Sequence, residues 1–310
     1  MKKMGPREPT SDEKEDHETT HIPFRNWCRH CVRGRGKEEA CRRDGRIPEV
    51  PEVHLDFMFM EDEKSEKTLA MLVAKERTTK AVMGCVAPRK SSGEWLAKRV
   101  MAFMREFGCE LEKMTMKTDN EPALVAVVDQ VGRLRAAKGG KGMAVEHSPV
   151  HSSKSNGIIE RAVQSVQGVI RTMRSALEEK WGVKLDAEHM VWPWLVEYAA
   201  YLLTRAEVGA DGKTAYERSR GKVAKLVGVE FAEGVLWKRR REGGPLGKLT
   251  CMWEDGIFLG VKGSTGEMIV GDEKGVWRTR SIRRKPDGGK MESGEYGKDR
   301  RGTVEDDERE

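Results

Sequence analysis

The sequence has no long apolar run, and this argues against a membrane-spanning helix. Its longest apolar stretch, from Met190 to Thr204, contains Glu197 and is shorter than the ~20 residues that a spanning helix needs. The N-terminal segment has no apolar stretch after its lysines, so we expect no secretory signal. We therefore expect neither secretion nor a membrane partner.

Cysteine and aromatic residues are also scarce. Six cysteines are spread over 310 residues and only Cys28 and Cys31 are close together, so we expect a reducing compartment and no disulfide framework. Aromatic residues make up 6% of the chain, but the apolar types reach 37%. This is enough for one sizeable core and a small second module, and too much for a wholly disordered chain.

The formal net charge of +6 is unevenly distributed. Residues 1–20 carry a net charge of −2 and residues 286–310 carry −4, which leaves +12 in residues 21–285. A body with this excess indicates a polyanionic partner, of which nucleic acid is the commonest. The alternative is a soluble basic protein without such a partner.

Composition and pattern divide the chain into five segments. The charged ends, 1–16 and 286–310, predict disordered acidic tails. Residues 17–46 form a basic segment that contains histidine and cysteine, and residues 50–220 form the main domain. Short strand-like runs separated by glycine turns predict a small β-rich module over 229–285.

The main domain has the pattern of an α/β protein with a mixed five-stranded sheet and helices on its faces. The periodicity predicts strands at 53–60, 68–76, 80–87, 113–119 and 142–148, and helices at 91–108, 121–137, 156–180 and 188–205. In the long helix, apolar residues recur at alternating intervals of four and three and predict a buried stripe. Beside this stripe runs a polar ridge, formed by Glu160, Gln164, Gln167, Arg171 and Arg174.

Three carboxylates stand out in this pattern. Asp56 lies inside the apolar run of the first strand, Asp119 ends the fourth strand in KTDNEPAL, and Glu160 lies near the start of the long helix in SNGIIER. If the first and fourth strands are neighbours and the helix crosses them, the three acids converge and can hold two Mg²⁺ or Mn²⁺ ions for phosphoryl transfer. Taken singly, each has a structural explanation, since strand acids are often paired and a glutamate at a helix start favours the helix dipole.

Two of these motifs resemble those of a known family. KTDNEPAL and HSPVHSSKSNGIIERAVQSVQGVIRTM resemble the second and third catalytic-acid motifs of retroviral-type integrases, in particular those of copia-type LTR retrotransposons. HLDFMFM lies where the first acid strand of that family belongs, and the resemblance covers residues 50–220. One departure is the interval of 40 residues, 120 to 159, between the second and third acids, which is longer than the retroviral pattern.

The resemblance implies a ribonuclease H-like fold and a polynucleotidyl transferase with endonuclease activity. It implies 3′-end processing and strand transfer of retrotransposon DNA into target DNA, with two Mg²⁺ or Mn²⁺ ions held by Asp56, Asp119 and Glu160. It further implies DNA partners and a homo-oligomer, and we expect a nuclear site of action, with cytoplasmic protein as well. The alternatives are a catalytically inactive integrase-derived nucleic-acid-binding protein, or another ribonuclease H-like nuclease or transposase.

The basic segment contains a candidate zinc site. Two imidazoles and two thiols, a donor set that tetrahedral Zn²⁺ favours, come from His17, His21, Cys28 and Cys31. The integrase resemblance supports zinc here, but the six residues between the second histidine and the first cysteine are too few for the three-helix zinc bundle of that family. We predict a compact knuckle in which His30 or Cys41 is an alternative ligand; otherwise the segment holds a reduced cysteine pair in a basic linker.

Basic and polar side chains near the acids are candidate DNA contacts. Catalytic carboxylates repel phosphate, so flanking positive charge must offset that repulsion. We predict such contacts from Lys154, Arg161, Gln164, Gln167, Arg171 and Arg174. Further basic patches lie at 25–46, 133–141, 238–241 and 278–285, and contacts of this type position the DNA backbone without reading its sequence.

Overall fold

The computed structural model describes residues 7–36, 48–62, 65–87, 93–147, 153–239, 249 and 251–285. The acidic tail predicted at 286–310 and the alternative zinc ligand Cys41 lie outside these residues. In the part of the chain that the structure describes, no helix has the length and apolarity needed to cross a bilayer.

A mixed five-stranded sheet forms the centre of the main domain, with the strand order β3-β2-β1-β4-β5. Strands β1 to β3 form an antiparallel meander, whereas β4 runs parallel to β1 and β5 parallel to β4. The strands are β1 (Glu52–Asp62), β2 (Ser65–Glu76), β3 (Val82–Val86), β4 (Met114–Thr118) and β5 (Met143–His147). This is the expected ribonuclease H-like sheet, and its first and fourth strands are neighbours as predicted.

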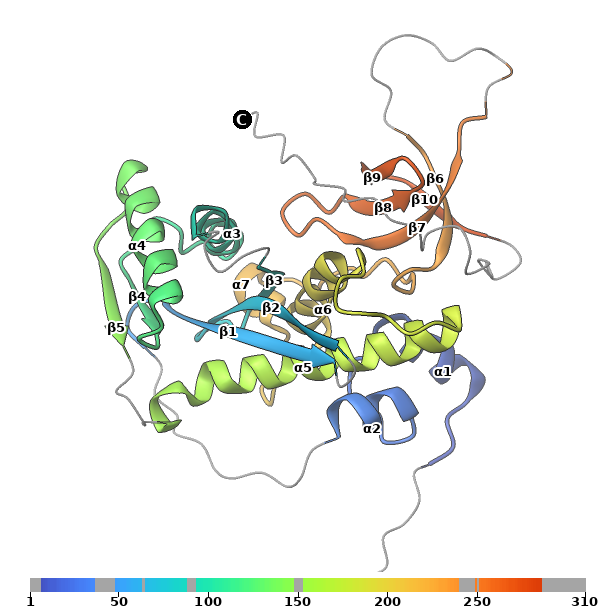
Figure 1. Ribbon diagram of the computed structural model, residues 1–310, viewed down its shortest axis with the longest axis horizontal. Coiled ribbons are helices and arrows are strands. Elements are labelled where there is room, and N and C mark those ends of the chain that lie inside the picture. The colour runs from blue at the N-terminus through green and yellow to red at the C-terminus, as the bar shows by residue number, and fades with distance from the viewer. Residues whose placement is uncertain are drawn as a thin grey trace, which may run out of the picture.

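Helices cover both faces of this sheet (Figure 1). Alternate residues of β1 enter two different cores. Val53 and Leu55 pack with α3 (Gly93–Glu106) and α4 (Pro122–Ala137). Met58, on the other face, joins the core that contains α5 (Ser153–Trp181) and α6 (Trp192–Ala206). Because side chains alternate along a strand, Asp56 lies on the α5 face.

Local backbone geometry shifts several predicted boundaries. Lys80 has a φ of +71° and closes the turn after β2, so β3 begins at Val82 rather than at residue 80. Pro193 lies in the first turn of α6, which therefore begins later than the predicted residue 188. Helix α5 extends further toward the N-terminus than predicted. The helix predicted at 91–108 ends as α3 at Glu106, and Gly108, with a φ of +76°, turns the chain after it.

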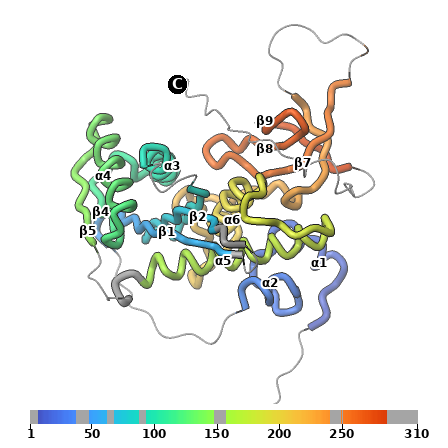
Figure 2. Tube along the Cα trace, viewed as in Figure 1, coloured from blue at the N-terminus to red at the C-terminus, as the bar shows by residue number. Residues whose placement is uncertain are grey.

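A helix, α1 (Ser11–Thr20), begins inside the segment predicted to be a disordered tail. It begins at a capping box: the Thr10 hydroxyl accepts from the Glu13 backbone N–H at 3.2 Å, and the Glu13 carboxylate accepts from the Thr10 N–H at 3.0 Å. The prediction of a disordered tail used only the charged composition of the segment. Composition does not contain a local capping signal of this kind. A second helix, α2 (Arg29–Arg35), packs on α5 (Figures 1 and 2).

The C-terminal segment forms a second five-stranded sheet, in the order β10-β6-β7-β8-β9. All of its strand pairs are antiparallel. It follows the short helix α7 and comprises β6 (Gly234–Trp237), β7 (Glu254–Val261), β8 (Met268–Asp272), β9 (Gly275–Thr279) and β10 (Ile282–Arg284), with α7 at Ala215–Arg220. Trp237 is fully buried in this module, and its ring stacks on Trp277 with centroids 6.0 Å apart.

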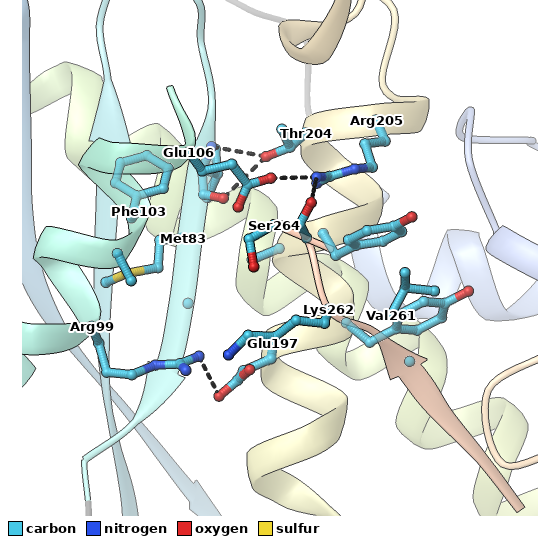
Figure 3. Close-up of a pocket in the computed structure, with 18 of the residues that line it drawn as sticks. Met83, Arg99, Phe103, Glu106, Glu197, Thr204, Arg205, Val261, Lys262 and Ser264 are labelled. Carbon is cyan, nitrogen blue, oxygen red and sulfur yellow. Dashed lines mark hydrogen bonds and ion pairs between the residues drawn. The ribbon is translucent and has the colours of Figure 1, made fainter. Parts of the chain in front are cut away.

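The β-rich module packs directly on the main domain. Phe258 of β7 meets the ring of Tyr198 on α6 edge-on, with centroids 5.5 Å apart. Gly260 lets β7 approach closely, since a Cβ at this position would lie 3.2 Å from the Tyr198 ring. Beside this contact, Arg205 of α6 pairs with Glu106 of α3 in a cleft of about 140 Å³ (Figure 3). One apolar cluster therefore runs from α5 and α6 into the module.

Candidate functional site

The parallel pairing of β1 with β4 brings the first two acids together. The register pairs His54 with Lys117. Two residues further along each strand come Asp56 and Asp119, the latter immediately after the end of β4. Neighbouring strands lie about 4.8 Å apart, and side chains at paired positions point to the same face. Asp56 and Asp119 are therefore neighbours on the face that α5 covers.

Helix α5 supplies the third acid. Ile159 is buried against the sheet with 2% of its surface exposed, and this contact sets Glu160 at the edge of the same face, where it is half-buried. The predicted buried stripe of α5 is confirmed, since five of its six members have at most 5% exposure: Ile159, Val166, Ile170, Met173 and Leu177.

The electrostatics of Asp56 show that these acids share one region. Burial raises the pKa of Asp56 from 3.8 to about 6, and the charge of Asp119 is the next largest contribution. The charges of Glu121 and Glu160 raise the pKa further, against the lowering effect of a hydrogen bond from the backbone N–H of Phe57. Four carboxylates from β1, the β4–α4 loop and α5 therefore act on one another.

The donor set of these acids suits hard divalent cations. Within the described ranges, Asp56, Asp119 and Glu160 have no lysine or arginine ion-pair partner, so their mutual repulsion is not offset by the protein there. Carboxylate oxygens are the ligands that Mg²⁺ and Mn²⁺ prefer. Three carboxylates of this kind could hold two such ions about 4 Å apart.

Two residues beside the acids were missed in the sequence. Glu121 is the N-cap of α4, and its backbone N–H donates to Asp119 Oδ1 at 3.0 Å. His147 ends β5, and its Nδ1 lies 3.4 Å from the Asp119 carbonyl oxygen. The position of Glu121, two residues after a catalytic-type aspartate, was a usable sequence signal. His147 had none, because only the pairing of β4 with β5 brings it there.

The four predicted zinc ligands come together. Their ligand atoms all lie within 4.8 Å of one another, and all four side chains are buried: His17, His21, Cys28 and Cys31. His17 Nε2 is 3.3 Å from Cys31 Sγ, and His21 Nδ1 is 3.6 Å from Cys28 Sγ. Ordinary zinc–nitrogen and zinc–sulfur bonds in a tetrahedron place N and S about 3.5 Å apart. The cluster is therefore compatible with zinc in both donor type and spacing.

Hydrogen bonding favours a thiolate in this cluster. A hydrogen bond from Cys28 is the main cause that lowers the pKa of Cys31, and His17 and His21 act in the same direction. The ring atom His17 Nδ1 is buried without a hydrogen-bond partner among the described residues. His30, the alternative ligand, is directed elsewhere, because its Nδ1 lies 2.8 Å from Ser175 Oγ on α5.

The predicted DNA contacts divide into two groups along α5. Arg161 and Gln164 are exposed near Glu160, and Gln167 is half-buried. Toward the other end, Arg171 Nε donates to the Gly34 carbonyl of α2 at 3.0 Å, and Arg174 Nε donates to Glu178 at 2.7 Å. The side chain of Lys154 lies outside the described residues. DNA binding by all six stays a prediction.

One arginine of the basic patch predicted at 133–141 has a structural position. Arg135 is 2% exposed. Its guanidinium donates to the carbonyl oxygens of Cys109 at 3.2 Å and Lys141 at 3.0 Å. Arg135 therefore ties α4 to the loop before β4 instead of presenting its charge to a partner.

Comparisons with known proteins give only weak likenesses. No protein-family model matches the chain, and no curated protein matches it. Among solved structures, the magnesium-bound catalytic core domain of HTLV-2 integrase in its trimeric form is similar with 16% identity and a TM-score of 0.39, over 57% of this chain and 100% of that one. A structure of the simian T-cell lymphotropic virus intasome with a PP2A regulatory subunit is similar with 13% identity and a TM-score of 0.41, over 87% and 96% of the two chains. Scores of this size do not assign a function, which must come from the chain's own residues and their geometry.

Proposed function

We propose that this protein is an integrase of the retrotransposon type, which processes the 3′ ends of element DNA and joins them to target DNA. The observation that carries the proposal is the convergence of acids from β1, β4 and α5. Asp56, Asp119 and Glu160 share one face of the sheet, and burial, together with the charges of the neighbouring carboxylates, raises the pKa of Asp56 to about 6. Structural acids are normally paired, whereas a cluster of carboxylates that repel one another is typical of a cation site.

The residues have separable roles in this reaction. Asp56, Asp119 and Glu160 would hold two Mg²⁺ or Mn²⁺ ions, whose chemistry when bound is activation of the attacking oxygen and stabilisation of the leaving oxygen. Asp56 must lose its proton to act as a ligand, and a pKa of about 6 places that loss just below neutral pH. The Glu121 N–H orients the Asp119 carboxylate through its 3.0 Å hydrogen bond. Arg161 and Gln164, about one turn or less from Glu160 on α5, are placed to contact phosphates.

The proposal includes several partners and places. The substrates are element ends and target DNA, and joining two ends requires a homo-oligomer. We place the reaction in the nucleus, where the target DNA is. The cluster of His17, His21, Cys28 and Cys31 binds zinc in a structural role, because closed sites with four protein ligands leave no position for a substrate.

A strand-transfer assay tests the proposal. Labelled element-end duplex and supercoiled target are incubated with purified protein and Mg²⁺ or Mn²⁺, and joined products are separated from hydrolysed ones. We expect joining by the wild type and its loss in Asp119→Asn, with Asp129→Asn as the control because Asp129 is an exposed aspartate on α4. Equal joining by wild type and Asp119→Asn would refute the assignment. Hydrolysis without joining would indicate a nuclease, and DNA binding without cation-dependent chemistry an inactive relative.

A further inference from the structure

A second charged site lies at the other half of α5. Here α2 packs along α5 (Figures 1 and 2). Side chains of the two helices border a cleft of about 360 Å³. Five cationic side chains from three segments of the chain line it, namely Arg29, Arg33, Arg171, Arg174 and Lys184. Only two carboxylates accompany them, Glu178 and Glu179, which leaves an excess of three positive charges.

The two carboxylates position the cations without neutralising them. Glu178 accepts from Arg174 Nε at 2.7 Å and from Lys184 Nζ at 2.7 Å. Glu179 pairs with Arg29 at 2.8 Å. Arg33 is exposed, and no hydrogen bond or ion pair is found for it in the described part of the chain. The cleft therefore combines held cationic groups with one arginine that is available to a ligand.

The contact between α2 and α5 fixes this arrangement. Gly34 of α2 lies so close to α5 that a Cβ there would be 2.2 Å from Thr172 Oγ1 and 2.6 Å from the Thr172 backbone nitrogen. Arg171 reaches across to donate to the Gly34 carbonyl at 3.0 Å. At the other end of α2, Cys28 and Cys31 anchor it in the His/Cys cluster. The cations are thus set in place before any ligand arrives.

We propose that this cleft binds a phosphate of the DNA backbone, at a fixed distance from the acids. Planar guanidinium groups donate paired hydrogen bonds to phosphate oxygens, and several converging arginines favour phosphate over a single carboxylate. On α5, Arg171 lies 11 residues after Glu160, and Ser175 lies 15 residues after it. At 1.5 Å per residue these intervals span about 16–22 Å.

This distance along α5 sets which nucleotide of a bound DNA strand lies in the cleft. For a strand that runs along α5 and advances about 3.4 Å per nucleotide, the cleft lies about five to seven nucleotides from the phosphodiester at the acids. The inference rests on the proposed function for this register, because only that function places a reacting phosphodiester at Asp56, Asp119 and Glu160. The charge of the cleft and its affinity for a DNA backbone do not depend on catalysis.

Fluorescence anisotropy with a labelled 30-base-pair duplex tests the affinity, using the full chain with Asp119→Asn so that no chemistry intervenes. The test variants are Arg33→Gln and the double change Arg29→Gln with Arg33→Gln, and Lys222→Gln is the control at an exposed loop position. Removing one phosphate-binding side chain should weaken binding about eightfold at 0.1 M salt and reduce the slope of log K against log salt by about 0.9. Zinc content and thermal unfolding confirm that each variant folds.

Unchanged affinity and salt slope in both variants, equal to those of Lys222→Gln, would overturn the proposal. So would tighter binding of a polyglutamate peptide than of DNA of equal charge, which would assign the cleft to an acidic protein. The position of the cleft along the DNA has its own test, since neutral methylphosphonates five to seven nucleotides from the joined end should weaken DNA binding by the wild type more than binding by the double variant. Equal weakening of DNA binding in the wild type and in the double variant would refute the proposed spacing of five to seven nucleotides. If the chain binds DNA through the cleft but never joins it, the proposed function fails while the cleft assignment stands.

Discussion

Replacing Asp56 by asparagine should stabilise the protein while removing the proposed strand-transfer activity. The change keeps the size of the side chain and removes a charge that burial disfavours and that Asp119, Glu121 and Glu160 repel. In the unfolded chain this carboxyl has its ordinary pKa of 3.8, whereas in the folded protein the pKa rises to about 6. Since a pKa difference of one is worth about 1.4 kcal/mol, the ionised Asp56 costs the folded state at most about 3 kcal/mol.

The expected gain is smaller than this limit and depends on pH. Asp56 is only half-buried, so solvent screening reduces the gain to about 1–2 kcal/mol. Because the pKa of Asp56 is higher in the folded protein, its ionisation does not destabilise the wild type below about pH 4. The loss of stability grows between about pH 4 and pH 6 and is complete above that range. Asp56→Asn should therefore match the wild type at pH 4 and exceed it at pH 8 in free energy of unfolding. For a chain of 310 residues the gain corresponds to about 1.5–3 °C in Tm.

Thermal and urea unfolding in buffer without divalent cations or chelator measure this directly, with Asp129→Asn as the matched control. The control should change stability by less than about 0.5 kcal/mol at either pH. Adding Mg²⁺ should stabilise the wild type more than Asp56→Asn, by about 1.4 kcal/mol at ten times the dissociation constant. If Asp56→Asn is no more stable than the wild type at pH 8, neither burial nor the neighbouring carboxylates penalise the ionised Asp56, and the cation site loses its main support.

Three further substitutions test the arrangement. Gly34→Leu should destabilise the protein by about 2–3 kcal/mol in urea unfolding, because the new side chain overlaps Thr172; unchanged stability would mean that α2 is not docked there. Cys28→Ser should remove bound zinc, measured by mass spectrometry of the native protein, and lower the Tm; full zinc retention would exclude Cys28 as a ligand. Gly260→Ala should cost about 1–2 kcal/mol, because its φ of +136° and the Tyr198 ring oppose a side chain, and a neutral effect would contradict the close packing of the β-rich module.

The periodicity of the sequence was sufficient to predict the main sheet and its cores. The strand predicted at 53–60 is present within β1, and its alternation places Leu55 and Asp56 on opposite faces of the sheet. Convergence of Asp56 and Asp119 was an inference from strand order, and the parallel register of β1 and β4 supplies the physical reason. Where prediction used repeating patterns, it succeeded, because burial of one face forces the pattern on the sequence.

The sequence could not predict features that depend on single contacts between distant residues. The docking of α2 on α5 requires Gly34 to meet Thr172, and no periodicity connects residues so far apart in the sequence. Arg135 was counted among surface charges, although it is buried and bonded to carbonyl oxygens. Whether an arginine faces a partner or closes a loop is decided by the carbonyl groups around it, and these become neighbours only in the folded chain.

The two charged sites on α5 can act on one DNA molecule without cancelling each other. The acids near Glu160 and the arginines of the cleft are of opposite sign, but about 16–22 Å of helix separates them. At 0.1 M salt the Debye length is about 10 Å, so each site acts mainly on the phosphates beside it. In the proposed function, the acids therefore remain free to bind divalent cations, while the arginines bind the DNA backbone several nucleotides away. A shorter separation would let the arginines pair with the acids and remove the repulsion that favours cation binding. Helix length is thus the property of α5 that allows both sites to coexist.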